Sequence, residues 1–573
     1  MPPSGSHPVI IARKLLLLAS WLQGTPPGYR VTTGPGPGED YHDYACRLVS
    51  TASKLVMRND ELLTSIEGIE CLMLESMYLN NGGHLRRAWF TSRKALAVAQ
   101  MLGIHQGTGS SAGTWLDEDA SRTRIDPDYM WLRLVLTDRY LSLMLGLPQG
   151  TLENVFATPE ALSDCAGLER FERMLGVAAG LILQRNSVQR LDLGYTQKID
   201  TLLQEAANCL PAQWWVVENP RSSDGASDDF QQSLRLVNQI AYHHLLIQLH
   251  LPYLLQSPPV PSGYDYNKMT AAIASRNILV QFIAFRASET NTVYCRGIDF
   301  ITFTASMTLC LAHMECRRRR SSDDTHTNAG AVDSSSAFHA LRHQRLSDRG
   351  LVERTLQIMD DMAALNEDVV VRKISQLLTP LLEIESDAAS GEGYRASSSS
   401  CVHAAAAAPE SQWTSEMARG ASHGLLSVQI PYFGTIKIEH SQGDSTATGS
   451  NQTGPSLVSR YDFAAQSVGQ FDPGPQMPPP RHHAGYEMTN VQPANTDWQP
   501  VPSFVDQLSP PILPSQTSVT ISEDAPSSKA PSLETVSGLE EKDCLLVPGL
   551  EADLEDWVLQ GVDGAFFSSL IQE

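Results

Sequence analysis

The chain has 573 residues, and its 42 Lys and Arg against 64 Asp and Glu give a formal net charge of −22. This excess of negative charge repels phosphate, which excludes a protein that binds nucleic acid over most of its surface. The nine cysteines are scattered without short paired spacings, which excludes a disulfide scaffold and a compact zinc site. We interpret them as reduced intracellular thiols.

The first predicted element is a helix over residues 9–22, with the apolar sequence VIIARKLLLLASWL. A secretory signal would place its cations before the apolar stretch, whereas Arg13 and Lys14 lie inside it. We therefore interpret the segment as an amphipathic helix of a folded domain. No apolar run reaches the ~20 residues that a membrane-spanning helix needs, so we expect no membrane contact.

From residue 1 to about 385, apolar residues recur three and four positions apart, which predicts an all-α domain. Ile66–Leu79 and His84–Leu102 are separated by Asn80-Asn81-Gly82-Gly83, so we expect two helices joined by a tight turn. Further helices are predicted near residues 129–145, 164–192, 196–208, 229–255, 267–288, 296–316 and 349–385.

After residue 385 the composition changes to Ser, Gly, Pro and Ala, which bury too little apolar surface to offset the entropy cost of ordering. We predict a disordered linker over residues 386–540. Within it, residues 429–438 (QIPYFGTIKI) mix β-branched and aromatic side chains and predict a short strand docked on the helical domain. Residues 541–573 change again, to acids interleaved with large apolar side chains.

Two stretches imitate catalytic motifs. Gly109–Gly113 fits the G-x-S-x-G string of a hydrolase nucleophile elbow, but an elbow follows a buried strand and this segment follows a predicted helix. Asp360-Asp361 and Glu367-Asp368 suggest the magnesium-binding aspartates of an all-α terpenoid synthase. Ala364, however, stands where the third carboxylate should project. We interpret the first stretch as a connector and the second as a solvated helix face.

Two further groups lie at the end of the helix predicted over 296–316. Cys310, His313 and Cys316 share one helical stripe, but three ligands without a fourth are a weak metal signal, so we interpret them as a packed face. A basic run follows, made of Arg317, Arg318, Arg319 and Arg320. The run fits either a solvated helix end, where cations complement the helix dipole, or a nuclear import signal.

Two longer constellations are more specific. The first runs from Tyr78 through Asn80-Asn81-Gly82-Gly83, Ala88-Trp89, Ala95 and Ala99 to Leu102-Gly103-Ile104-His105; the second contains Trp131-Leu132, Asp138-Arg139 and Gly146-Leu147-Pro148. Neighbouring side chains on a helix point about 100° apart, so Asp138 and Arg139 are expected to find different partners. Together with residues 7–24 and 242–255, these stretches resemble the fungal-specific transcription factor domain, the helical regulatory region downstream of a binuclear zinc cluster.

The resemblance covers most of residues 7–385 and implies a nuclear regulator of RNA polymerase II transcription, often of metabolic or secondary-metabolite genes, with no catalytic residues. It implies zinc only for an upstream six-cysteine cluster, and this sequence begins in the helical region. DNA contact is then expected either through a missing N-terminal zinc module or through a partner, and a homodimer is left open. The alternative is an all-α enzyme with an unrecognised active site.

Residues 541–573 are predicted to be an acidic activation segment that contacts a coactivator or another transcription protein. Repulsion among the carboxylates keeps the apolar side chains exposed, which suits capture of a helix in an apolar groove. The expected contacts are Leu554, Trp557, Val558, Leu559, Phe566, Phe567 and Leu570.

Overall fold

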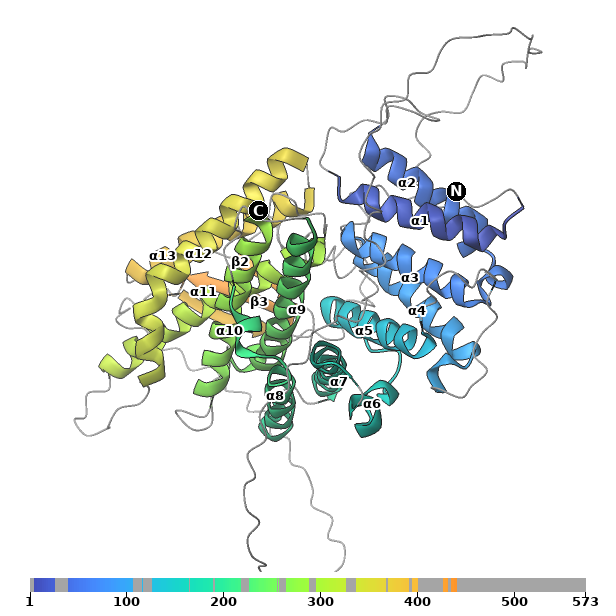
Figure 1. Ribbon diagram of the computed structural model, residues 1–573. Helices are drawn as coiled ribbons and strands as arrows, with labels where there is room; N and C mark the ends of the chain where they lie inside the picture. Colours follow the sequence, from blue (N-terminus) through green and yellow to red (C-terminus); the bar gives the residue numbers. More distant parts are fainter. Residues whose placement is uncertain are drawn as a thin grey trace, which may run out of the picture. The chain divides into compact units, whose positions relative to one another are not determined.

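The computed structural model describes residues 5–25, 40–106, 116, 126–163, 165–188, 191–217, 226–254, 256, 264–287, 295–325, 336–366, 369–390, 394–399, 426–430 and 434–440 (Figure 1). In this part of the chain, helices make up nearly all of the regular structure and one small sheet is added to them. The predicted all-α class is therefore confirmed, with the sheet as an addition.

The N-terminal helices pack in chain order. They are α1 (Pro8–Gln23), α2 (Tyr41–Ala52), α3 (Ile66–Asn81), α4 (Leu85–Met101) and α5 (Pro127–Leu145), with short helical turns η1 (Ser53–Met57), η2 (Asp60–Leu63) and η3 (Ile104–Gln106). Helix α1 packs on α2 and α3, α3 packs on α4, and α4 packs on α5. Helices α3 and α4 are the predicted αα-hairpin, whose turn places Gly83 at a φ of 82°.

The second group of helices follows α5 in the chain. It contains η4 (Val155–Ala157), α6 (Pro159–Ser163), α7 (Gly167–Val188), α8 (Leu193–Ala207), η5 (Ala212–Trp215), α9 (Ala226–His250), η6 (Leu251–Tyr253), α10 (Asp265–Ala287), α11 (Arg296–Thr325), α12 (Ser336–Asn366) and α13 (Val369–Ser390). Helix α10 packs on α9, α11 and α12, and α11 packs on α13. One apolar core runs from α3 through these helices to the sheet.

Helices α2, α12 and α13 differ from the prediction. The block predicted over 349–385 is two helices, α12 and α13, which pack against each other. Apolar residues recur at helical spacing in both helices, with Met359 buried in the first and Ile374 in the second. The sequence pattern therefore did not indicate where the first helix ends and the second begins. Helix α2 was not predicted, although Asp40 caps it by accepting a hydrogen bond from the His42 amide.

The sheet lies where the sequence predicted linker. Strand β3 (Gly434–His440) is central and pairs antiparallel with β1 (Tyr394–Ser399) and β2 (Leu426–Ile430). The segment predicted to dock, 429–438, spans the end of β2 and most of β3, and Ile436 and Ile438 are buried in the core. Helix α13 continues to Ser390, past the domain boundary predicted at residue 385, and β1 follows it in the chain.

Helix α11 also corrects one expectation. Residues Arg296–Arg318 are long and apolar enough to cross a membrane, although no such run was expected from the sequence. Of the most apolar 18-residue stretch in this segment, 94% is buried in the fold. Thr302, Ser306 and Thr308 each donate a hydroxyl hydrogen bond to the carbonyl four residues earlier. This pattern is typical of a core helix whose hydroxyl groups are satisfied by hydrogen bonds to the helix's own backbone carbonyls.

Candidate functional site

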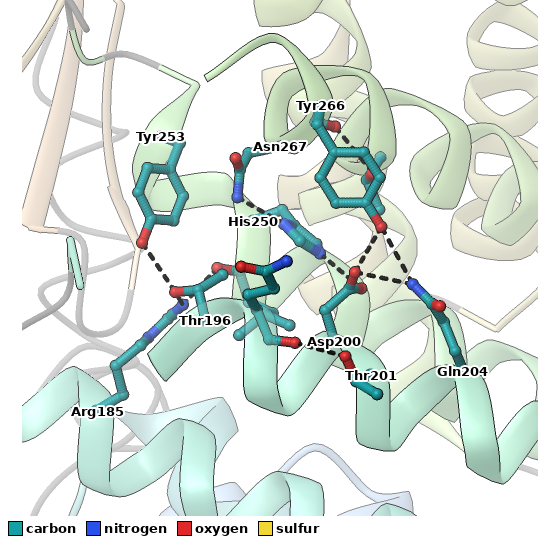
Figure 2. A network of polar contacts seen from close by, with 12 residues as sticks. Arg185, Thr196, Asp200, Thr201, Gln204, His250, Tyr253, Tyr266 and Asn267 are labelled. Carbon is teal, nitrogen blue, oxygen red and sulfur yellow. Dashed lines mark hydrogen bonds and ion pairs between the residues drawn. The ribbon is translucent and has the colours of Figure 1, made fainter. Parts of the chain in front are cut away.

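Polar side chains from α7, α8, α9, η6 and α10 meet in the interior (Figure 2). We call them the Asp200 network, which consists of Arg185, Thr196, Asp200, Gln204, His250, Tyr253, Tyr266 and Asn267. Most of these residues are buried, while Gln204 and Tyr266 lie at the exposed edge. A buried polar group without a hydrogen-bond partner costs free energy of folding. The partners of each side chain therefore show whether the network is structural or could act on a ligand.

His250 lies between a carboxylate and an amide. Its Nε2 is 3.2 Å from Asp200 Oδ1, and its Nδ1 is 3.0 Å from Asn267 Nδ2. With Asn267 donating to Nδ1, the imidazole is neutral and Nε2–H donates to Asp200. Burial lowers the pKa of His250 despite the opposing effect of Asp200. Burial alone would raise the pKa of Asp200, but hydrogen bonds from His250 and Tyr266 outweigh it and leave that pKa below its ordinary value.

Arg185 forms the other half of the network. Its guanidinium donates to the carbonyl oxygens of Gln248 and Leu249, at 3.0 Å and 2.6 Å, near the C-terminal end of α9. It also donates to Thr196 Oγ1 at 3.0 Å, and that oxygen is 2.8 Å from the Tyr253 hydroxyl. Burial lowers the pKa of Arg185 to about 10, so it stays protonated at neutral pH. The cation thereby satisfies carbonyls that a helix end leaves without intrahelical partners.

A carboxylate beside an imidazole is the pair that general-base catalysis uses. Here both ring nitrogens of His250 are hydrogen-bonded, to Asp200 and Asn267, and Asp200 Oδ2 accepts from Tyr266 and Gln204. The imidazole therefore has no nitrogen left to take a proton from a substrate, and the network instead ties four helices together. Sequence reasoning missed this network, although polar residues inside the apolar stretch 242–255 were a usable signal.

Asp138 and Arg139 find different partners, as predicted. Asp138 pairs with Arg93 of α4 at 2.6 Å and accepts from the Gly150 amide at 2.7 Å. Arg139 donates to acceptors in the loop after α5 and in α7, namely Asn154 Oδ1 and the carbonyls of Thr151, Glu153 and Gly176. Asp138 therefore links α5 to α4, and Arg139 links α5 to α7.

The Cys310–His313–Cys316 stripe is buried in the core. His313 Nε2 lies 2.8 Å from Asp348 Oδ2, and Arg276 pairs with the same carboxylate through two hydrogen bonds. Burial raises the pKa of the Cys310 thiol, which disfavours the thiolate that binds metals. Among the described residues no group of three or more His, Cys, Asp or Glu side chains could hold a metal ion.

The basic run lies inside a helix, because α11 continues to Thr325. Arg317 and Arg318 are exposed, and Arg318 pairs with Glu315 at 2.7 Å. Glu315 in turn holds the buried Lys268 of α10 at 2.9 Å. The predicted helix end at 316 is therefore wrong, since the run extends α11 by further turns.

Several predicted features lie outside the residues that the structure describes. These are the Gly109–Gly113 segment, Glu367-Asp368 and the expected activation contacts Leu554, Trp557, Val558, Leu559, Phe566, Phe567 and Leu570. Of the aspartate pair, Asp360 accepts a hydrogen bond from Ser375 of α13, and Asp361 is exposed.

Comparison with known proteins gives matches that cover this whole chain and about 70% of each relative's length. No family model and no solved structure matches the chain. A dehydrocurvularin biosynthesis regulator of Alternaria cinerariae is 33% identical over 100% of this chain and 74% of that protein. A protein of the same name from Aspergillus terreus is 32% identical over 100% of this chain and 73% of its own length. Transcription factor sdnS of Sordaria araneosa is 30% identical over 100% of this chain and 69% of its own length.

Proposed function

Since the chain belongs to the family of fungal transcription regulators that these relatives represent, we propose that it activates genes for the biosynthesis of one secondary metabolite. The observation that carries the proposal is the similarity over the whole chain to proteins named as biosynthesis regulators. The helical part takes the role of the fungal-specific transcription factor domain, and the protein acts in the nucleus on RNA polymerase II transcription.

We assign no reaction to the helical domain. The acid–base pair of the Asp200 network has both nitrogens of its imidazole hydrogen-bonded within the protein, so it supports a structural function. A protein with a net charge of −22 is poorly suited to approach DNA over a broad surface. Base-specific DNA contact is therefore assigned to an N-terminal zinc cluster or to a partner.

Deleting the coding sequence in its host tests the function. Transcripts of one co-located set of biosynthetic genes should collapse, while genes outside that set keep their levels. Restoring the full chain should restore those transcripts, whereas restoring a chain without residues 545–573 should not. Unchanged transcripts of every biosynthetic gene set would overturn the proposed function.

The activation segment has a separate test. Residues 545–573 fused to an unrelated DNA-binding domain should activate a reporter, because their acids keep large apolar anchors exposed for a coactivator groove. The triple variant Trp557→Ala, Phe566→Ala and Phe567→Ala should remove most of the signal, and the control Ser568→Ala with Ser569→Ala should keep it. A triple variant as active as the control would contradict the apolar contact.

Nuclear import is assigned to the basic run in α11. A fluorescent fusion of the full chain should lose nuclear accumulation when Arg317 to Arg320 are all changed to Ala. The control changes Arg342 and Arg354 of α12, which are exposed. Equal nuclear signal in both variants would place the import signal elsewhere.

A further inference from the structure

Helix α10 presents a largely apolar stripe on its outward face. The spacings along it alternate between three and four residues, as in the heptad repeat by which one helix packs along another. Tyr266 is 57% exposed and Ile273 is 47% exposed, and the other members are half-buried. We call these residues the α10 stripe: Tyr266, Met269, Ile273, Arg276, Val280 and Ile283.

The other faces of α10 are already covered. Helices α9, α11 and α12 pack on it, and its buried residues, among them Ala274, Ile278 and Phe282, belong to the apolar core. A helix that is apolar on every side is normally enclosed by other elements. The α10 stripe therefore has the composition of a contact surface, although Tyr266 and Ile273 are left largely exposed.

The α10 stripe can be covered without burying an unpaired charge. Its one charged member, Arg276, donates two hydrogen bonds to Asp348 of α12, at 2.6 Å and 2.8 Å. The other cations of α10, Lys268 and Arg286, pair with acids of α11. The one acid of α10, Asp265, precedes the stripe. An apolar partner therefore suits the stripe better than a charged one.

The spacing of the α10 stripe fits a second copy of itself. Spacings of three, four, three, four and three read the same from both ends, so an antiparallel copy matches the stripe at every position. With a twofold axis between positions 274 and 275, Tyr266 faces Ile283 of the second copy and Met269 faces Val280. Arg276 then packs its apolar stem on Ile273 and does not meet its own counterpart.

The area of the α10 stripe agrees with a weak contact. The stripe and its flanks leave roughly 500 Å² accessible on each copy, and the ~1,000 Å² that a pair would bury is the lower limit for a specific interface. We propose that two copies of the chain associate through the α10 stripe, antiparallel about a twofold axis. Because the interface is small, the dimer forms in a concentration-dependent way.

The inference goes beyond the proposed function and does not depend on it, because association is measured on the purified chain. A host without any change in biosynthetic transcripts would leave the dimer unaffected. A chain that stays monomeric would overturn only the α10 contact, since transcriptional activation by the same chain is measured separately.

Sedimentation velocity of the full chain tests association. The average mass should rise from that of a monomer toward that of a dimer as the concentration is raised from about 1 to 100 µM. Ile273→Asp, near the middle of the stripe, should raise the dissociation constant at least about tenfold, because central apolar anchors dominate the free energy of an interface. Ile283→Asp should act in the same direction. A monomer at every concentration, or a wild-type dissociation constant in both variants, overturns the proposal.

Two controls place the same charge on other surfaces. Met101→Asp of α4 and Val188→Asp of α7, at positions 76% and 88% exposed, should leave the dissociation constant unchanged. Circular dichroism should show the same helical content in all four variants. A control that abolishes the dimer as fully as Ile273→Asp overturns the assignment to α10.

Disulfide trapping tests the orientation and needs no added charge. One chain carries Met269→Cys and another carries Val280→Cys, and the two are mixed and mildly oxidised. Mass spectrometry of the peptides distinguishes the new disulfide from those of native cysteines. A disulfide between residues 269 and 280 is expected in the mixture, because facing positions lie within disulfide reach. A 269–269 disulfide in the first chain alone indicates a parallel pair, and no disulfide at either position places the interface elsewhere. Either result overturns the proposal.

Discussion

Arg139 shows how a single side chain can hold a connection in place. It is 1% exposed, and its planar guanidinium reaches Asn154 and the carbonyls of Thr151, Glu153 and Gly176. Burial lowers its pKa to about 10, so the group is still a cation at neutral pH. The loop after α5 is therefore ordered by a charge rather than by apolar packing alone.

Removal of this cation should destabilise the protein strongly. In Arg139→Met the carbonyls lose their donor inside the core, and we expect a loss of about 3 kcal/mol or more in the free energy of unfolding. Urea denaturation of the full chain, followed by circular dichroism, measures it. Arg354→Met, an exposed position on α12, should change it by less than about 0.5 kcal/mol. Similar midpoints for the two variants would contradict this role.

Two buried histidines make the free energy of unfolding depend on pH in the acid range. Burial lowers the pKa of His243 and of His244 from 6.5 to about 4, so the folded protein keeps them neutral while the unfolded chain protonates them. The contribution of the two neutral histidines to the free energy of unfolding is fully present above pH 6.5. It falls as the pH drops from 6.5 toward 4, because the unfolded state binds more protons in that range. The depressed pKa of Asp200 acts later, because its contribution is lost only as the pH falls below 3.8.

Urea midpoints measured between pH 7.5 and 4.5 check this window. The midpoint should fall steadily below pH 6.5 in the wild type and less steeply in His244→Gln, which retains an amide near Gln248 but cannot be protonated. His343→Gln, at an exposed position, should follow the wild-type slope. A His244→Gln slope as steep as that of the wild type would show that other groups cause the acid dependence.

The helical hairpin shows what local sequence determines. Apolar spacing in 66–79 and 84–102 and the Asn-Gly turn between them were enough to predict α3, α4 and their connection. Helix α2 was not predicted, although its buried residues Ala45, Leu48, Val49 and Ala52 recur three and four positions apart and form an apolar stripe. This stripe was a usable sequence signal for a helix that packs on α1. The Asp200–His250 contact was missed because fifty positions separate its partners, and no spacing rule brings such residues together.

The hairpin turn gives a matched pair of substitutions. Gly83 has a φ of 82°, where an L side chain is strained, and an added Cβ would lie 3.3 Å from Arg296 Cδ of α11. Gly83→Ala should therefore cost about 1–2 kcal/mol of the free energy of unfolding. Gly82 has a φ of −76° and ordinary space around an added Cβ, so Gly82→Ala should cost much less. Thermal denaturation of both variants makes the comparison, and equal losses would refute the conformational argument.

At the scale of the molecule, the folded domain extends past the last helix. Leu426, Ile436 and Ile438 of the sheet belong to the same apolar core as α10 and α11. Composition placed β1 and most of β2 in a linker, because short strands among Ser and Gly resemble loops until their pairing partners are known. Most of β3 lies within residues 429–438, which were predicted as a docked strand.

Truncated chains test whether the folded domain ends after α13 or after β3. A chain ending at residue 390 should be less soluble and melt at a lower temperature than one ending at residue 440, because it leaves core surface uncovered. Differential scanning fluorimetry and soluble yield measure the difference, with Lys437→Ser, an exposed position of β3, as a control in the longer chain. Equal melting temperatures for both lengths would mean that the sheet adds nothing to the helical core.

The strand order β1-β3-β2 has a consequence for how the protein is made. The central strand comes last in the chain, so neither β1 nor β2 has its neighbour until residues 434–440 have left the ribosome. Until then the nascent chain presents two unpaired strands and part of an uncovered core, which are the features that chaperones and proteases recognise. Slow codons placed after residue 440 would give the sheet time to close, whereas the same codons before residue 434 would prolong its exposed state.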